Sequence, residues 1–550
     1  MTERQPILVC TAWPYANGSL HVGHLAGVYV PADVFARYQR LRGHDVLMIS
    51  GTDAHGTPVT VRADQEGSSP AEIAARYHAE YLSYWRDLGI SYDLYTTTTT
   101  DNHRRVVQDE FMLLLEKGLL FTQRTMGFYD PVARRFLPDT YIEGECPYCH
   151  YPRARGNQCE NCGRLLEPED LIDPHSRLNP SAVLERRETE HFYLDLPRLE
   201  QPLLDWARPM VHWRPNVYRF TINFLEGGLQ PRAITRDLTW GVPLPPQVGP
   251  GWDDKRIYVW FEACSGYLSA AVEWAANRDE PDAWQHWWQD PACRQYYFIG
   301  KDNIPFHTVI WPAILIGRGD VILPYDIPAN EYMNSGGQKA SKSASVGATV
   351  PQLLKAFDPD AIRYYLIANA PETADSDYSE EDFVRRNNDE LVATWGNLVH
   401  RTLSFLQRSF DGVVPPHTTD PEVLDRIDVS RAAVEKMLDA VHLRMGLREA
   451  LNLARFGNEW FDRRAPWKQV REDRDAANET MGSLLDLINA AKVLFAPFLP
   501  HTSATLHQLL GYTDALEAAG WHFEPLPGGR KLPAPRPLFK KLEVSAEEAA

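Results

Sequence analysis

The pattern of apolar and polar positions at the start of the chain predicts a strand, a turn and a helix. Residues 7–12 form a short, mainly apolar run, as in a buried strand. Across residues 22–43 apolar side chains recur at helical spacing, at Leu25, Val28, Val34, Tyr38 and Leu41. The turn between these two elements, residues 14–24, reads P-Y-A-N-G-S-L-H-V-G-H.

The alternation of strand and helix continues to about residue 118, which indicates an α/β domain. Residues 46–50 predict a second parallel strand, and the loop G-T-D-A-H-G-T follows it. After an interruption, the runs 258–263 and 296–300 predict further buried strands, of which the first enters a helix. Because ligands bind at the carboxyl ends of strands in open α/β sheets, we expect the loops after these strands to face one another.

The last third of the chain has a helical pattern. Apolar residues follow helical stripes over 395–410 and 481–498, and we interpret them as the core of a helical region. Beyond residue 511 proline and charged residues are frequent. This segment is expected to pack back as an irregular arm through residues 537–539 and to fray at its end.

Length and charge limit the function classes. A chain of 550 residues is too long for one core, so two to four domains are expected. It has no apolar run of 18 residues and no apolar leader at its start, so we expect a cytoplasmic protein without a membrane segment. A net charge of −18 argues against nucleic-acid binding through overall charge, so any contact with RNA must be local.

Four of the seven cysteines have the spacing C-x2-C-x9-C-x2-C. Two such pairs predict knuckles that hold one tetrahedral Zn²⁺ ion with no open position for a substrate. The ion would hold together an insert that is poor in apolar residues, and losing one ligand would unfold that insert. The other three cysteines are scattered, so no disulfides are expected. The predicted ligands are Cys146, Cys149, Cys159 and Cys162.

The turn before the first helix has the features of an anion site. Unpaired N–H groups and the positive end of the helix dipole would face the point where His21 and His24 stand, one turn apart. Gly23 between them lets a ligand approach the backbone. The dinucleotide fingerprint and the P-loop motif are both absent. Taken alone, H-V-G-H is equally compatible with two ordinary histidines at a helix start.

A second motif, G-Q-K-A-S-K-S at residues 337–343, changes that balance. Lys339 and Lys342 bracket small residues, so a flexible segment could close two cations onto phosphate. Together the two motifs resemble the signatures of class I aminoacyl-tRNA synthetases, and the flanking residues resemble the methionyl-tRNA synthetase family. Ala340 stands where that family has a methionine.

The resemblance implies a fold and a reaction. The fold is α/β, a Rossmann-like doubly wound parallel sheet with an inserted zinc-knuckle domain, followed by an all-α anticodon-binding helical bundle. ATP and L-methionine would give methionyl-adenylate and pyrophosphate, and methionine would then pass to tRNA(Met). The expected parts are two catalytic halves (1–118 and 233–320), the inserted domain (119–232), a stem-contact region with the lysine-serine loop (321–388), the anticodon-binding domain (389–511) and the C-terminal arm (512–550). Longer relatives carry a further dimerising domain, so a monomer is expected.

The same resemblance assigns residues to the first step. Asp53 would hold the methionine amino group, although a helix N-cap is its plain reading. The thioether pocket would comprise Ala12, Trp13, Tyr15, Trp260, Ala263, Tyr267 and His307, where ordinary core packing is the other reading of the aromatic residues. ATP, accompanied by Mg²⁺, would contact His21, His24, Lys301, Asp302, Lys339 and Lys342; for Lys301 and Asp302 a surface turn is the alternative.

Three positions depart from the bacterial pattern of the family. Trp13 stands where a leucine is usual, Cys264 where a proline or threonine is usual, and Ser265 where an aliphatic residue is usual. A bulkier first wall and a more polar second wall would reshape the amino-acid pocket. A related enzyme with altered amino-acid specificity therefore stays an alternative.

In the helical region Trp467 follows a proline in a polar, charged stretch. It suits stacking on an unpaired base as well as packing at a helix end. The family's anticodon reader matches Asn397, Arg401, Asp462, Pro466 and Trp467. Two rival functions stay open: a non-catalytic zinc-knuckle RNA-binding protein, which would not need the histidines and Lys342 together, and a small-molecule nucleotidyltransferase, which would not need the helical region.

Overall fold

The computed structural model describes residues 4–132, 134–156, 158–164, 166–177, 179, 181–336 and 348–544. A five-stranded parallel sheet has the order β14-β13-β1-β2-β3. Its strands are β1 (Pro6–Thr11), β2 (Asp45–Thr52), β3 (Leu94–Thr97), β13 (Arg294–Gly300) and β14 (Ala329–Asn330). The strand order reverses between β1 and β13. In open α/β sheets ligands bind beside such a reversal, at the carboxyl ends of the strands.

Helices cover both faces of this sheet. Successive residues of β1 point to opposite sides, and since they are apolar on both sides, each side packs against helices. Ile7 and Val9 belong to a core with α2 (Val30–Leu41) and α4 (Pro70–Leu88). Leu8 and Cys10 belong to a second core, formed with α5 (Asp101–Glu116), α8 (Val259–Ala276) and α10 (Trp311–Arg318). The predicted doubly wound parallel sheet is confirmed, and so is the predicted helix after β1, which runs through α1 (Val22–His24), η1 (Leu25–Tyr29) and α2.

The predicted strand at 258–263 is wrong. Strand β12 (Lys255–Ile257) ends earlier, and α8 begins at Val259 with Tyr258 as its N-cap. Most of α8 is buried, and a helix buried on nearly all sides is as uniformly apolar as a buried strand. Trp260 and Tyr267 both lie on α8.

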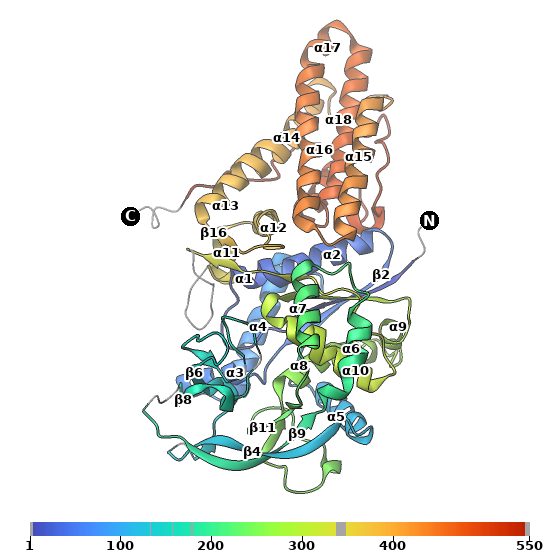
Figure 1. The fold of residues 1–550 in the computed structure, drawn as a ribbon. Helices are drawn as coiled ribbons and strands as arrows, with labels where there is room; N and C mark the ends of the chain where they lie inside the picture. The colour runs from blue at the N-terminus through green and yellow to red at the C-terminus, as the bar shows by residue number, and fades with distance from the viewer. Residues whose placement is uncertain are drawn as a thin grey trace.

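The insert leaves the sheet as a long antiparallel pair, β4 (Leu120–Asp130) and β9 (Glu185–Leu194). A small sheet with the order β7-β6-β8 carries the cysteines beside it. In Figure 1 these elements lie at the bottom, far from the orange helices. The other elements of the insert are β5 (Arg135–Phe136), β6 (Ile142–Glu145), β7 (Ala154–Arg155), β8 (Ile172–Ser176), α6 (Glu200–Ala207), α7 (Pro215–Glu226) and β10 (Arg232–Ala233).

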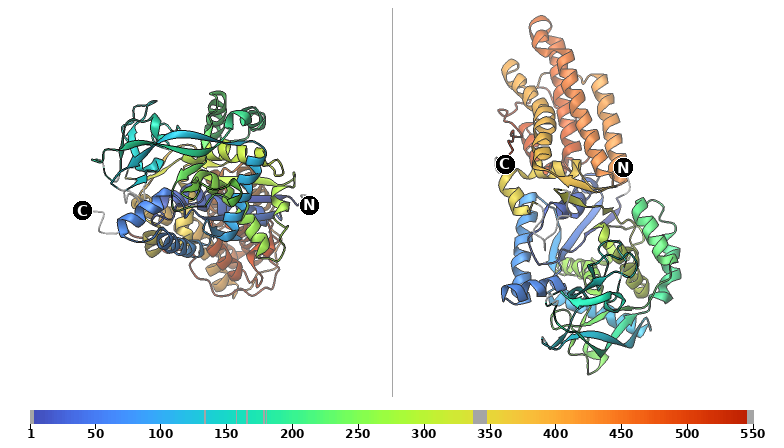
Figure 2. Two further views of the ribbon diagram at one scale, coloured as in Figure 1. Left: turned by 90° about the horizontal axis from the view of Figure 1, so that it is seen from below. Right: turned by 60° about the vertical axis from the view of Figure 1, so that its left-hand side comes forward.

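Elongated helices rise from the opposite side of the sheet, as both side views show (Figures 1 and 2). They are α14 (Asn397–Ser409), α15 (Pro421–Asp439), α16 (Leu443–Arg464), α17 (Pro466–Glu472), α18 (Arg474–Phe495) and α19 (Pro500–Leu509). Their apolar stripes are buried as predicted, in a core continuous with α2. The connection to the sheet consists of β15 (Met333–Ser335), α11 (Val350–Ala356), α12 (Pro359–Ala368), β16 (Ser376–Tyr378), α13 (Glu380–Arg386) and η8 (Asn387–Gly396).

A buried ion pair joins α2 to α12, and its arginine also bonds the segment just after α18. The Arg363 guanidinium lies 2.7 Å from the Asp33 carboxylate, and both side chains are fully buried. Arg363 also donates to the carbonyls of Pro497 (3.0 Å) and Phe498 (2.9 Å). Burial alone would raise the pKa of Asp33, but the charges of Arg37 and Arg363 hold it well below its ordinary value.

The C-terminal segment packs along the helices as an irregular arm. Asn387 donates to the carbonyl of Lys540 and Asn388 to that of Leu542, each at 2.9 Å. The fraying predicted for the chain end falls on residues 545–550, outside the described part. The bounds of the six parts given above stay a prediction. Among the residues described here, no helix is both long and apolar enough to cross a membrane.

Candidate functional site

The two histidines close the start of the helix that follows β1. His21 is the N-cap residue, and its Nδ1 accepts from the Gly23 N–H at 3.2 Å. His24 Nδ1 accepts in turn from the His21 N–H at 3.3 Å. The ring centroids are 3.8 Å apart. Two imidazoles therefore form a reciprocal cap at the positive end of a helix that continues to residue 41.

Both flanks of the lysine-serine loop lie beside this turn. After the loop, the Val22 N–H donates to the Ala348 carbonyl at 2.9 Å, and the Val350 N–H donates to the Leu20 carbonyl at 2.8 Å. Before the loop, the Met333 carbonyl lies 3.1 Å from where a Cβ on Gly23 would be. Lys339, Ala340 and Lys342 lie outside the described residues; the described residues on either side of them, Met333 and Ala348, lie next to the histidine turn.

Asp53 lies in the loop after β2, which is joined to the loop after β1. The Asp53 N–H donates to the Pro14 carbonyl at 3.0 Å, and the Ala16 N–H donates to the Asp53 carbonyl at 2.9 Å. The carboxylate accepts from the N–H groups of His55 (3.1 Å) and Gly56 (3.0 Å). Only 2% of Asp53 is exposed. The resulting geometry holds one carboxylate rigidly at the edge where β1 and β2 end.

This carboxylate sits in an acidic cluster. Burial, followed by the charge of Glu262, raises the pKa of Asp53 to about 8. Glu262 itself lies 2.6 Å from His55 Nδ1. Burial would lower the pKa of His55, but the Glu262 carboxylate raises it above its ordinary value. With a pKa of about 8, Asp53 is largely protonated at neutral pH in the free protein, and a ligand ammonium group beside it would favour the ionised carboxylate.

Aromatic side chains from three segments meet beside Asp53. The Tyr267 hydroxyl lies 2.7 Å from His307 Nε2, and His307 Nδ1 lies 2.9 Å from the Asn303 carbonyl. Burial lowers the pKa of His307 to about 4, so the ring is neutral: Nδ1–H donates to the carbonyl and Nε2 accepts from the tyrosine. Trp260 Nε1 donates to the Tyr15 hydroxyl at 3.4 Å. The structure thus brings residues of the α8, β1 and β13 segments together.

Two alanines complete this set. Ala12 continues the pairing of β1 with β13, since its N–H donates to the Phe298 carbonyl at 3.0 Å. Ala263 lies on α8, three residues after Trp260. Each of these positions carries only a methyl group as its side chain.

Trp13 occupies a space that two glycines provide. A Cβ at Gly51 would lie 2.4 Å from the indole, and one at Gly266 would lie 3.0 Å from it. The ring meets Tyr267 edge-on, with centroids 6.4 Å apart. Within the described structure the buried Trp13 Nε1 has no hydrogen-bond partner. Ser265 donates to the Phe261 carbonyl of its own helix at 2.9 Å, so its polarity is satisfied inside α8.

Lys301 and Asp302 follow the carboxyl end of β13 but are engaged with protein groups. The Lys301 ammonium lies 2.8 Å from Glu331 and 2.9 Å from Asp375, and it lies over the Tyr332 ring. Burial would lower the pKa of Lys301, but the two carboxylates raise it. The Tyr332 hydroxyl donates to Asp302. A phosphate at Lys301 would share the cation with two carboxylates, which is a weaker site than the sequence suggests.

The four clustered cysteines could hold a metal ion. Their sulfur atoms all lie within 4.8 Å of one another, with 4.0 Å between Cys146 and Cys162 and 3.5 Å between Cys149 and Cys159. The residue after each pair, His150 or Gly163, has a positive φ. Each donates its N–H to the carbonyl of the first cysteine of its pair, so both pairs form the same turn.

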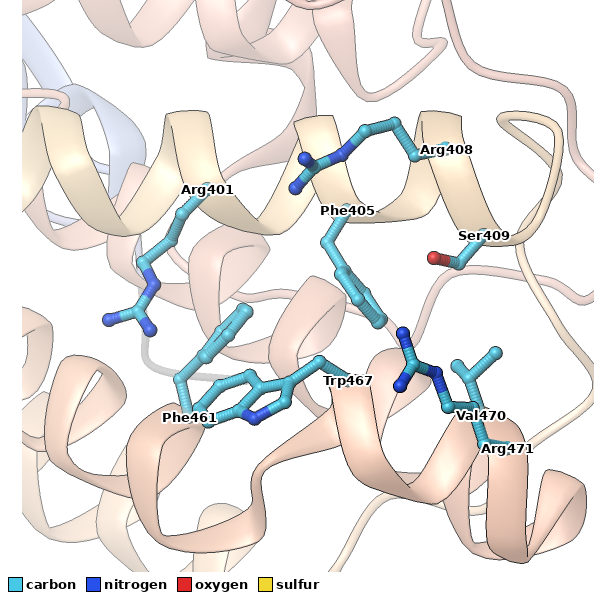
Figure 3. A pocket seen from close by; sticks show the side chains of 8 residues that line it. All are labelled: Arg401, Phe405, Arg408, Ser409, Phe461, Trp467, Val470 and Arg471. Carbon is cyan, nitrogen blue, oxygen red and sulfur yellow. The ribbon is translucent and has the colours of Figure 1, made fainter.

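The predicted RNA-contact residues line or border a hollow of about 440 Å³ at the far end of the helices (Figure 3). Phe461 lies between the Arg401 guanidinium, 3.9 Å from the ring centroid, and Trp467, whose ring is stacked on it at 6.0 Å. Trp467 is 43% exposed. The Asp462 carboxylate forms an ion pair with the Arg401 guanidinium at 2.5 Å, and the Asn397 side-chain amide donates to that of Asn458 at 3.3 Å. Pro466 begins α17 and is buried.

Sequence reasoning missed several residues of both regions. His55 and Glu262 surround Asp53, and Phe461 supports Trp467. His55 lies in the same loop motif as Asp53, and its buried partner could have been suspected from the single acidic residue in the apolar run at 258–263. Phe461 precedes Asp462 directly, but its stacking depends on the bend at Ala465, where the backbone has a φ of 47°.

Comparison with known proteins assigns both regions to one family. A family model described as tRNA synthetases class I (M) matches residues 7–403, and a model described as the anticodon binding domain of methionyl tRNA ligase matches residues 415–549. A methionine–tRNA ligase of Thermomicrobium roseum is 51% identical, covering 99% of this chain and 98% of that protein. One of Dehalococcoides mccartyi is 48% identical, covering 100% and 99%.

A solved structure agrees with this assignment. Methionyl-tRNA synthetase of Mycobacterium tuberculosis, bound by methionyl-adenylate, superposes with a TM-score of 0.80 at 25% identity, over 98% of this chain and 100% of that one. The match spans the sheet, the insert and the helices together. The chain therefore belongs to the methionine–tRNA ligase family of class I tRNA synthetases.

Proposed function

We propose that this chain activates L-methionine with ATP and transfers the methionyl group to tRNA(Met), using the two regions described above. One observation supports the catalytic half most strongly: both flanks of the lysine-serine loop are hydrogen-bonded or packed against the histidine turn. Residues more than 300 positions apart in the sequence thereby lie side by side after β1, where the strand order reverses.

In the first step, the methionine carboxylate attacks the α-phosphate of ATP and pyrophosphate leaves. Little covalent chemistry is asked of the protein, so positioning and charge stabilisation supply most of the rate. We assign Asp53 to the substrate ammonium group, because it is buried, is fixed by two N–H groups and would be ionised most readily beside a cation. His21, His24, Lys339 and Lys342 are assigned to the phosphates.

The methionine side chain is assigned to the aromatic set around Tyr267. A neutral His307 fixed by two hydrogen bonds leaves the pocket wall uncharged, which suits a thioether. Trp13 and Trp260 add polarisable walls. Lys301 and Asp302 are assigned to ATP, but as supporting contacts, because their neighbours Glu331, Asp375 and Tyr332 compete for them.

The cysteine cluster is assigned to Zn²⁺. Four ligands at the usual Zn–S distance of about 2.3 Å would place sulfur atoms about 3.8 Å apart, close to the two distances of 4.0 Å and 3.5 Å between sulfur atoms of different knuckles. Bound there, the ion would supply no open coordination position and would cross-link the insert. Mg²⁺ would arrive with ATP, and no protein ligand is assigned to it. A cytoplasmic location and a monomeric state remain predictions from the sequence.

In the second step, the tRNA 3′ end receives the methionyl group, while the anticodon binds about the Trp467 platform. The exposed indole, backed by Phe461 and Arg401, is suited to stacking on an unpaired base. Asn397 and Asp462 would contribute hydrogen-bonding groups at its edge.

Two substitutions test whether the regions have these separate roles. His24→Ala is expected to lower methionine-dependent ATP–pyrophosphate exchange by about a hundredfold, as for loss of a transition-state phosphate contact. His44→Ala, beyond the other end of the same helix, serves as the matched control and should change it less than about twofold. Trp467→Ala should leave exchange intact and lower tRNA charging. Equal loss of both activities in Trp467→Ala would contradict the separate role of the helical region.

A further inference from the structure

The hollow beside Trp467 contains two arginines that none of the assignments above uses. We infer that Arg408 and Arg471 bind backbone phosphates of the RNA strand whose base stacks on Trp467. The inference rests on the proposed function, since it takes tRNA as the ligand of this hollow. It adds a second kind of contact, because phosphates fix the position of a strand without reading its sequence.

Both side chains are placed for such a contact. Arg408 lies in the last turn of α14 and Arg471 in the last turn of α17, and both are exposed. The two helices face each other across the hollow, and the guanidinium groups lie on either side of Phe405 (Figure 3). A strand that enters with one base on Trp467 would therefore run between two cations.

The charges of these two arginines are not neutralised within the described structure. Neither guanidinium has a carboxylate within 4.0 Å, although Arg408 makes one weak contact at 3.3 Å with the carbonyl of Ser404. Neighbouring arginines differ. Arg401 is paired with Asp462 and Arg463 with Glu422. Arg474 has no carboxylate partner in the described structure either, but its guanidinium lies over the Phe410 ring and donates to the Ser409 carbonyl.

This difference matters because the protein as a whole carries a net charge of −18. An acidic protein gains little from general attraction to RNA, so local unpaired cations must supply the electrostatic part of binding. Arginine is also the residue best suited to phosphate, because its planar fork donates two parallel hydrogen bonds. Free guanidinium groups beside an exposed indole form the combination that binds single-stranded nucleic acid.

A simpler reading is that each arginine only stabilises the carboxyl end of its helix through the dipole. The two readings predict different measurements. Stabilisation of a helix end alters the melting temperature but not the salt dependence of RNA binding. A phosphate contact in a single strand contributes about 0.7 to the slope of log affinity against log salt concentration.

The test measures binding of tRNA(Met) to the full-length wild-type protein and to Arg408→Gln, Arg471→Gln and the double variant, from 50 to 300 mM salt. Arg463→Gln is the matched control, since it removes the same charge from an exposed but paired arginine nearby. Each single variant should lower the slope by about 0.7 and the double variant by about 1.4, with affinity about fivefold weaker per substitution near 0.1 M salt. The control should keep the wild-type slope.

A second readout uses a tRNA with an altered anticodon. The arginine variants should weaken the binding of both tRNAs by the same factor. Trp467→Ala should instead reduce the preference of the protein for tRNA(Met) over the altered tRNA. Slopes equal to that of the control, or a changed preference between the tRNAs, would overturn the phosphate assignment. If the wild-type protein binds tRNA but Trp467→Ala has no effect, the anticodon assignment fails first. Binding of an acidic protein at this hollow in place of tRNA would overturn both.

Discussion

Asp53→Asn should separate stability from activity. Asn keeps the Oδ1 atom that accepts from the His55 and Gly56 N–H groups, so the loop geometry is expected to survive. What disappears is the negative charge assigned to the substrate ammonium group. Leaving a buried charge without its partner typically costs about 3 kcal/mol or more, which corresponds to at least about a hundredfold in kcat/KM for methionine.

The same substitution should stabilise the folded protein. The pKa of Asp53 rises from 3.8 to about 8 on folding, so the carboxyl group costs stability once pH exceeds 3.8. At about 1.4 kcal/mol per unit, this cost reaches about 4 kcal/mol at pH 7 and about 6 kcal/mol above pH 8. Part of it is shared with Glu262 and His55, so we expect Asp53→Asn to gain about 1 to 4 kcal/mol at pH 7.

Urea unfolding of both proteins between pH 5 and pH 8.5, together with pyrophosphate exchange, measures the two effects. The stability gain should grow as pH rises and level off above pH 8. Asp237→Asn is the control, and it should destabilise the protein. Burial would raise the pKa of Asp237, but hydrogen bonding to His191 and the paired Lys255 lower it. If the Asp53→Asn variant is less stable than the wild type at pH 7, or retains full activity, this reasoning is refuted.

Three further perturbations test other parts. Lys342→Ala should lower the adenylation rate by about a hundredfold or more, which is equivalent to about 2.7 to 4 kcal/mol. The affinity for methionine, measured by equilibrium dialysis, should stay unchanged, and a parallel loss of this affinity would argue against a phosphate role. Cys159→Ser should abolish the zinc content measured by atomic emission and make the insert sensitive to proteolysis, whereas Cys293→Ser should do neither. Arg363→Met should lower the free energy of unfolding by about 3 kcal/mol, because it removes one of the two guanidinium groups paired with the buried Asp33 and leaves the carbonyls of Pro497 and Phe498 without this donor; a neutral result would mean that Arg37 alone is enough to neutralise Asp33.

Much of the fold follows from the sequence because its signals are local. The run before the histidine turn, the stripes of α14 and α18 and the C-x2-C pairs each have one periodicity or spacing that only one structure satisfies well. The strand predicted at 258–263 was wrong because this segment lacks such a signal. A short apolar run has no period to choose between strand and helix, and burial of most of α8 made its sequence equally apolar on all sides.

The candidate site was harder to predict from the sequence, because its electrostatics depend on contacts between residues that are distant in the sequence. His55 and Glu262 are 207 positions apart, yet their contact controls the charge around Asp53. Likewise, the partners of Lys301 lie 30 and 74 residues away, and they change it from an open cation to one shared with two carboxylates. The fit of Trp13 depends on Gly51 and Gly266, two glycines that no motif singles out.

The most direct test of the account is ATP–pyrophosphate exchange by the purified protein with methionine, leucine, isoleucine, valine and cysteine in parallel. We expect exchange with methionine and kcat/KM values at least a hundredfold lower with each of the others, since the aromatic set around Tyr267 and Trp13 is assigned to a thioether. Exchange that is faster with another amino acid would show that the pocket has a different substrate, and no exchange with any of them would contradict the proposed reaction.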